Sequence, residues 1–236
     1  MRTFDPHARD ARGPGTRRAV DSPTVSPPPA SGPRASSSGE PPVRRRAGRP
    51  GHDAESVLRV AVRVFNERGY DGTSMEDLAR ALGVTKSAIY HHFSGKSELL
   101  RRSLDHALDA LFAVTDEPGA TSGPAIDRLE YVVRGSVRVL VEELPHVTLL
   151  LRVRGNTAVE RHALERRREF DHFVGDLVRA GVEAGDIRPD IDPALAGRLL
   201  FGMVNSIVEW YRPGKGLDAP ELADALATVA FNGLRA

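Results

Sequence analysis

Along most of the chain, apolar residues recur every three to four positions, which is the spacing of amphipathic helices. The first such segment spans 53–68, with Val57, Ala61 and Phe65 on one face and Gly69 at its end. Capping signals and glycine or proline stops divide the remainder into further segments. We expect these helices at 74–82, 85–93, 96–115, 125–143, 146–154, 157–184, 192–211 and 218–234. Period-two alternation and hairpin turns are absent, so the sequence predicts an all-α fold.

The first 50 residues differ from the rest in composition. They contain ten prolines, ten arginines and only four acidic residues, for a net charge of +6, and they have little apolar periodicity. The remaining residues carry a net charge of −5, so the overall +1 conceals a basic tail joined to a mildly acidic body. We expect a disordered tail over 1–47, a small helical domain over 48–105 and a larger helical domain over 106–236.

Several protein classes are excluded by what the sequence lacks. There is no cysteine, which rules out disulfides, a thiolate nucleophile and Cys-based zinc sites. No apolar run approaches the roughly 18 residues of a membrane span, and the N-terminus has no hydrophobic signal region. We therefore expect a cytoplasmic protein with no membrane partner and no cofactor.

Residues 73–93 have the layout of a helix-turn-helix motif. A T-x-x-E capping box, Thr73 to Glu76, opens a short helix, Gly83 makes the turn, and a second short helix follows. We expect a three-helix domain built from this motif and the helix before it. Such a motif places its second helix in the major groove of DNA.

The second helix of this motif has one buried and one exposed face. Ile89 and Phe93 lie four residues apart and define the buried face. The exposed face then carries four polar side chains with one small residue at its edge: Lys86, Ser87, Tyr90, His91 and Ala88. No acidic residue occurs over 84–93, which suits a helix that must approach phosphates.

The stretch RVFNERGYDGTSMEDLARALGVTKSAIYHHFSGKSELL, residues 63–100, resembles the DNA-binding domain of the TetR (tetracycline-repressor) family. The likeness extends over roughly residues 48–105 and departs at His92, where a tyrosine is frequent in the family. The matching positions are Phe65, Gly69, Tyr70, Thr73, Ser74, Leu78, Ala79, Gly83, Val84, Tyr90, Phe93, Lys96 and Leu99. The resemblance implies a helical homodimer whose larger C-terminal domain binds a small effector.

The resemblance also implies how the candidate DNA-binding residues divide their roles. Helix N-termini and polar side chains would hold the phosphate backbone: Thr73, Thr85, Tyr90, His92 and Lys96. Residues near the start of the recognition helix would reach base edges: Lys86, Ser87, Ala88 and, one turn on, His91. An arginine-rich arm precedes the domain and would follow phosphates or enter the minor groove: Arg45, Arg46 and Arg49.

The segment 193–211 is apolar nearly all round, so it must be buried on more than one side. Ala196, Gly197, Gly202 and Ser206 are small enough to permit close helix approach. We expect this helix and the last one to form a four-helix interface with a second copy, where the TetR family also dimerises. A two-fold dimer calls for a palindromic double-stranded operator.

Large and polar side chains of the second domain are candidates for an effector pocket. They are Leu149, Arg152, Phe170, His172, Phe173, Met203, Asn205 and Trp210. Asn205 is either a pocket group or an amide satisfied within the dimer interface. The segment 185–214 also resembles TetR members that respond to acyl-CoA thioesters, which implies an acyl tail in the bundle and CoA phosphates near Arg152, Arg154 or Arg168.

Two Glu-x-x-His strings raise the alternative of a helical metalloenzyme. Pro145 interrupts the string from Glu143 to His146, the other runs from Glu169 to His172, and the adjacent His91 and His92 would point apart on a helix. We therefore predict no metal site and no enzyme activity.

The function predicted is a ligand-relieved homodimeric repressor, with an effector that is an acyl-CoA or another small molecule. An activator or dual regulator on the same scaffold and an effector-independent DNA-binding protein stay open.

Overall fold

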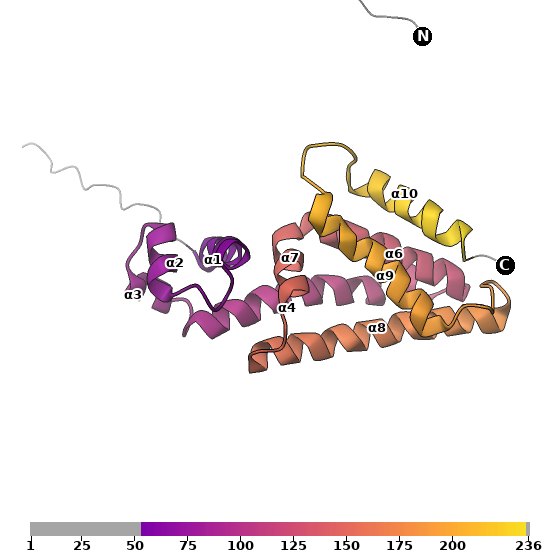
Figure 1. Ribbon diagram of the computed structural model, residues 1–236, viewed down its shortest axis with the longest axis horizontal. Coiled ribbons are helices and arrows are strands. Elements are labelled where there is room, and N and C mark those ends of the chain that lie inside the picture. Colours follow the sequence, from indigo (N-terminus) through magenta and orange to yellow (C-terminus); the bar gives the residue numbers. More distant parts are fainter. Residues whose placement is uncertain (1–52, 235–236) are drawn as a thin grey trace, which may run out of the picture. The chain divides into compact units, whose positions relative to one another are not determined.

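The structure is a computed structural model that describes residues 53–234. Within that range no strand forms, and β-type pairing is limited to isolated bridge positions, Arg212 with Lys215, and Ile187, which confirms the all-α prediction. The helices, shown in Figure 1, are α1 (Ala54–Arg68), α2 (Met75–Leu82), α3 (Lys86–Tyr90), α4 (Lys96–Asp116), α5 (Pro118–Thr121), α6 (Ala125–Glu142), α7 (Leu144–Arg152), α8 (Ala158–Ala184), α9 (Pro193–Trp210) and α10 (Ala219–Asn232).

Helices α1, α2 and α3 form the predicted helix-turn-helix head. Phe65, Leu78 and Ile89, one from each helix, are at most 2% exposed and share one core. Gly83 ends α2 in the left-handed conformation, at φ 68°, which a residue with a Cβ adopts only at a cost. This tight turn lets α3 follow directly, so the second helix of the motif stands where a recognition helix must.

The capping box of α2 lies one residue later than the sequence predicts. Ser74 is the N-cap, its hydroxyl accepting from Asp77 N at 3.2 Å while Asp77 accepts from Ser74 N at 3.0 Å. The T-x-x-E and S-x-x-D patterns overlap here, and aspartate at this position reaches the N-cap backbone as well as glutamate does. Thr73 therefore lies outside the helix, and Glu76 is left on its surface.

The long helix α4 runs from the head into the C-terminal bundle (Figure 1). It packs against α1 at one end and against α6, α7 and α8 further along. At Gly135 of α6, an added Cβ would come within 2.3 Å of Val114 Cγ1 in α4, so only glycine permits this approach. The bundle is completed by α9 on α8 and α10 on α6.

Several helix boundaries differ from the predicted ones, and α3, expected to reach residue 93, ends at Tyr90. The predicted loop over 116–124 contains the short helix α5, which begins with Pro118. Pro145 does not break a helix but stands in the first turn of α7, where a missing backbone N–H costs nothing. Glu143, between α6 and α7, and His146, one residue after the proline, therefore lie close to the same corner.

The head also contacts the bundle directly through α1 and α7. The side-chain amide of Asn66 in α1 donates to the Pro145 carbonyl at 2.8 Å. A shift of α7 would therefore act on α1 through this hydrogen bond as well as through α4.

The predicted tail over 1–47 and the arm residues Arg45, Arg46 and Arg49 lie outside the described residues. Among the helices of residues 53–234, none combines the length and the apolar character needed to cross a bilayer.

Candidate DNA-binding surface and effector pocket

The outer face of α3 and the turn after it is polar and open to solvent. Ile89 and Phe93 are 0% and 2% exposed, which confirms the predicted buried face. Thr85 caps α3, with its hydroxyl 3.3 Å from Ala88 N and 2.9 Å from the Ser87 hydroxyl. The exposed residues beside this cap are Lys86, Ser87, Ala88, Tyr90, His91 and His92. These six and Thr85 are the part of the predicted DNA-binding set that the structure gathers on one surface.

Lys86 has an acidic partner that the local sequence does not reveal. Its ammonium forms an ion pair with Glu76, which lies ten residues earlier on α2. Their hydrogen bond lowers the pKa of Glu76 and raises the pKa of Lys86. The segment 84–93 has no acid of its own, but the fold supplies one, so Lys86 must exchange this partner before it can contact a base.

Two residues predicted to hold phosphates are directed inward. Thr73 is 2% exposed, and its hydroxyl donates to the Gly69 carbonyl at 2.7 Å. Lys96 donates to the Tyr70 carbonyl at 2.8 Å, and its ammonium lies 4.2 Å from the centre of the Tyr70 ring. Both side chains hold the loop between α1 and α2, so the phosphate role predicted for them does not fit this arrangement.

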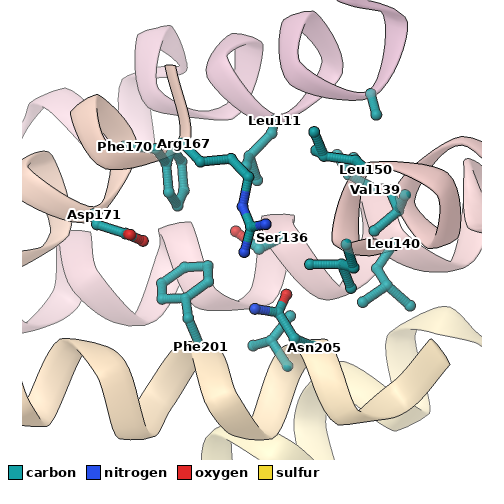
Figure 2. A pocket seen from close by; sticks show the side chains of 14 residues that line it. Leu111, Ser136, Val139, Leu140, Leu150, Arg167, Phe170, Asp171, Phe201 and Asn205 are labelled. Carbon is teal, nitrogen blue, oxygen red and sulfur yellow. The ribbon is translucent and has the colours of Figure 1, made fainter. Parts of the chain in front are cut away.

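A small pocket lies in the middle of the C-terminal bundle (Figure 2). Its volume is about 50 Å³, little more than the space of one water molecule in the liquid (about 30 Å³). Five helices line it, through Ala107, Leu111, Ser136, Val139, Leu140, Val147, Leu150, Leu151, Arg167, Phe170, Asp171, Phe201, Val204 and Asn205. Most of these side chains are apolar, so the pocket favours an apolar guest with few polar atoms.

Arg167 places a positive charge in this apolar pocket. Figure 2 shows its guanidinium directed toward Ser136 and Asn205. No ion pair to Arg167 within 4.0 Å is formed by any of residues 53–234. Partial burial lowers the pKa of Arg167 and raises the pKa of Asp171 at the edge of the pocket. An anionic or carbonyl oxygen entering the pocket would find a donor without a partner.

A second, wider pocket of about 450 Å³ lies between α8 and α9. It shares Asp171 and Phe201 with the first pocket, so the two adjoin. Its wall mixes apolar and charged residues and carries three arginines, Arg168, Arg179 and Arg198, together with Asp171 and Asp176. Arg179 pairs with Asp176 at 2.6 Å, whereas no ion pair of Arg168 or Arg198 with residues 53–234 is found.

Two family models match most of the described chain. Residues 57–102 match the model of bacterial regulatory proteins of the tetR family, and residues 122–234 match the tetracyclin repressor-like C-terminal domain. The HTH-type transcriptional repressor KstR2 of Rhodococcus jostii is 31% identical over 82% of this chain and 96% of its own length. The chain belongs to the TetR family. It is a DNA-binding transcriptional regulator.

Solved structures of TetR proteins have the same fold. SCO3833, a TetR member from Streptomyces coelicolor A3, is 60% identical, with a TM-score of 0.72 over 76% of this chain and 91% of its own. The structure of AibR in complex with isovaleryl coenzyme A and operator DNA is 24% identical, with a TM-score of 0.66 over 75% of this chain and 97% of its own.

Within the TetR fold, the eight predicted effector-binding residues do not share one pocket. Phe170 and Asn205 line the central pocket, and His172 lines the wider one. Leu149 and Arg152 lie at another hollow near Tyr70, where Arg152 is bonded to the backbone of α1. The remaining three, Phe173, Met203 and Trp210, line neither the central nor the wider pocket. That a residue is apolar or aromatic does not by itself show whether its side of the helix faces a cavity.

Arg167 was missed because it stands within three consecutive arginines, Arg166 to Arg168, which resemble a solvated helix face. Its spacing could have identified it. Arg167, Phe170 and Val174 follow the i, i+3, i+7 pattern of the inward face of α8, and the last two are buried.

Proposed function

We propose that this TetR regulator is a homodimeric repressor that binds a palindromic operator and is released by an acyl-CoA effector. A DNA-binding domain over 48–105 would act on chromosomal DNA in the cytoplasm under the control of an effector and dimerisation domain over 106–236. The observation that carries the proposal is the adjoining pair of pockets, one apolar and one rich in arginine.

Dimerisation is supported by an unpartnered apolar face on α9 and α10. Leu195 and Leu199 are 48% and 57% exposed, and they lie on the same face of α9 as the exposed Gly202 and Ser206. Val229 of α10 is 71% exposed. Large apolar side chains beside small residues suit close packing of helices from a second copy. A two-fold dimer would present two copies of α3 to successive turns of the duplex.

The acyl-CoA class is supported by the chemistry of the two pockets. The central pocket would take the apolar acyl end, with Arg167 near the thioester carbonyl, and Arg168 and Arg198 would meet the phosphates of CoA. The central pocket is far below the roughly 300–1,000 Å³ of ligand sites, so helices must separate to admit an acyl chain. AibR, which shares the fold, is known in complex with isovaleryl coenzyme A and operator DNA.

Release from DNA would follow from the position of α4. Ala107 and Leu111 of α4 line the central pocket, and the other end of α4 packs on α1 of the head. A ligand that widens the pocket would displace α4, and the distance between the two heads of the dimer would change with it. The effector acts only if it binds the displaced state more tightly than the DNA-bound state.

The test is an operator titration, with the DNA flanking the gene as the first probe and fluorescence anisotropy as the readout. We expect acyl-CoAs to weaken binding, and free CoA and free fatty acids to do so less. Substituting both Arg168 and Arg198 with alanine should raise the acyl-CoA concentration needed for release. Arg188→Ala is the matched control, because Arg188 pairs with Asp190 and lines neither pocket.

Operator affinity that no acyl-CoA changes would refute the acyl-CoA part of the proposal. If acyl-CoA instead strengthens operator binding, the release of a repressor is refuted and the activator alternative is supported. Neither outcome depends on the dimer interface, which is tested separately below.

A further inference from the structure

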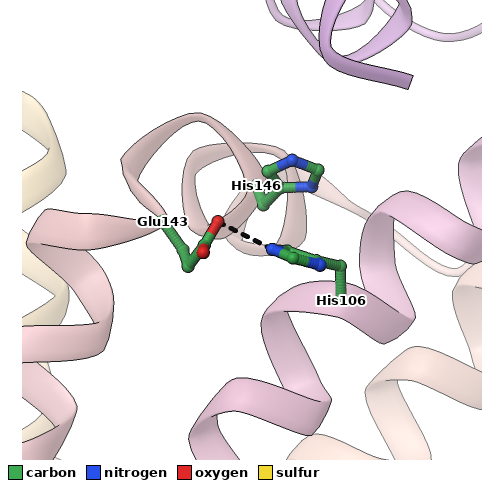
Figure 3. Close-up of side chains that lie close together, drawn as sticks. All are labelled: His106, Glu143 and His146. Carbon is green, nitrogen blue, oxygen red and sulfur yellow. Dashed lines mark ion pairs between the residues drawn. The ribbon is translucent and has the colours of Figure 1, made fainter. Parts of the chain in front are cut away.

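Three side chains that can bind a metal meet where α4 crosses the start of α7 (Figure 3). They are His106 of α4, Glu143 just before α7 and His146 in its first turn. One ligand atom from each lies within 4.8 Å of those of the other two. His106 Nε2 is 2.8 Å from a Glu143 carboxylate oxygen, and the centres of the two imidazole rings are 4.4 Å apart.

The ring of His146 is buried and fixed by a hydrogen bond to the backbone. It is 8% exposed, and its Nδ1 lies 3.2 Å from the carbonyl of the fully buried Ser103. A carbonyl only accepts, so Nδ1 carries the hydrogen and Nε2 keeps its lone pair. Metal-binding histidines commonly donate their second ring N–H to such an acceptor, which fixes the tautomer and the ring.

The donor set selects a class of metal. Two imidazoles and one carboxylate suit Zn²⁺ and related divalent transition ions, whereas Mg²⁺ and Ca²⁺ prefer oxygen ligands alone. Metal–ligand bonds of about 2.0–2.2 Å place the donor atoms of a tetrahedral site roughly 3.4 Å apart. The His106–Glu143 pair, now at 2.8 Å, must therefore open slightly, while more distant donor atoms close in. The side chains of His106 and Glu143 are 47% and 31% exposed, so both can turn without disturbing the core.

The cluster opens onto a groove between α1 and α7, which leaves room for water as a fourth ligand. The groove has a volume of about 620 Å³, and its wall carries Glu55, Glu67, Glu142 and Glu143 together with Arg59 and Arg63. Glu55 is paired with Arg59, so the excess of carboxylates over guanidinium groups favours a cation only moderately. The cluster is thus accessible from solvent on one side and supported by the buried Ser103 on the other.

We propose that His106, Glu143 and His146 bind one divalent transition metal ion of the Zn²⁺ class, with water completing the coordination. An ordinary ion pair would need only His106 and Glu143. It does not account for the second, buried imidazole of His146, which has a ligand atom within 4.8 Å of the donor atoms of both. The bound ion ties α4 to α7, next to the Pro145 carbonyl that accepts from Asn66 of α1.

The test uses the full chain, freed of metal with a chelator and titrated with Zn²⁺ by calorimetry and with Co²⁺ by visible absorption. We expect one ion per chain and the visible d–d bands of Co²⁺ in a low-coordinate site. His106→Ala changes an exposed side chain and Glu143→Gln a half-buried one, and both should abolish this binding without unfolding the protein. Circular dichroism of each variant confirms that the fold is kept.

His162→Ala is the matched control, because His162 also lies within 3.9 Å of a glutamate, Glu165, but has no second histidine beside it in the structure. It should bind the ion as the wild type does. A wild type that binds no stoichiometric ion overturns the proposal. So does binding that survives in His106→Ala and Glu143→Gln, because the ion is then held elsewhere. This readout needs no DNA, so its outcome is independent of the proposed repressor function.

Discussion

The guanidinium of Arg152 in α7 donates a hydrogen bond to the backbone carbonyl of Asn66 in α1 at 2.8 Å, which joins the C-terminal bundle to the DNA-binding head. The side-chain amide of Asn66 in turn donates a hydrogen bond to the carbonyl of Pro145, at the start of α7. A residue expected to contact an effector is therefore part of the connection between the two domains. Movement of α7 reaches the head through two hydrogen bonds as well as through α4.

Arg152→Ala removes one of these bonds, and we expect it to weaken the coupling between effector and operator by about 0.5–2 kcal/mol. The measurement is the ratio of operator affinities with and without effector, compared with the wild type. Arg154→Ala is the control, since the Arg154 side chain is exposed and only its backbone N–H has a described bond, to Glu160. An unchanged ratio in Arg152→Ala would show that α4 alone transmits the signal.

Glu76→Gln should strengthen operator binding. Glu76 holds Lys86 in an ion pair on the DNA-facing side of the head, and it adds a negative charge near the phosphates. The amide removes the charge and frees the ammonium, so the affinity should rise and Lys86→Ala should cancel the gain. Glu169→Gln is the control, because Glu169 is exposed on α8, away from the head. Weaker binding by Glu76→Gln would mean that Glu76 positions Lys86 for its base.

Leu199→Asp should convert the protein to a monomer. Leu199 is 57% exposed in the middle of the apolar face of α9, and a carboxylate buried against a second copy would be desolvated without a partner. Analytical ultracentrifugation measures the mass of the variant, and operator affinity should fall when the dimer is lost. Leu217→Asp is the control, since Leu217 is similarly exposed, at 48%, but lies in the loop before α10. A dimeric Leu199→Asp variant would place the interface elsewhere.

Glu98 should make the head sensitive to acid. It accepts hydrogen bonds from the backbone N–H and the hydroxyl of Ser94, and these bonds lower its pKa from 4.5 to about 2. Because the folded pKa lies below the unfolded value, this stabilisation is complete above pH 4.5 and is lost as the pH falls toward 2.

Glu98→Gln should therefore lower the melting temperature at pH 7 and have little effect near pH 2. Thermal unfolding followed by circular dichroism across that range measures the difference. Glu169→Gln again serves as the control. A difference that stays constant with pH would show that packing, and not the charge of Glu98, stabilises the start of α4.

Local pattern was enough to predict the helices and the buried side of the recognition segment, because Ile89 and Phe93 are four residues apart and both are buried, although α3 itself ends at Tyr90. The sequence pattern did not reveal contacts between residues that lie far apart along the chain. The Lys86–Glu76 pair spans two helices, and His106 lies 37 and 40 residues from Glu143 and His146. Sequence reasoning dismissed Glu143 and His146 because Pro145 would break a shared helix. The corner between α6 and α7 brings them together without one.

The size of the central pocket has a kinetic consequence. A space of about 50 Å³ gives an acyl chain nothing to enter until α4 and its neighbours have moved apart. Opening then precedes capture, so the observed association rate should stop rising at high effector concentration and level off at the rate of opening. Once the proposed effector is abundant, the response time of the regulator would thus be set by the opening of the bundle itself.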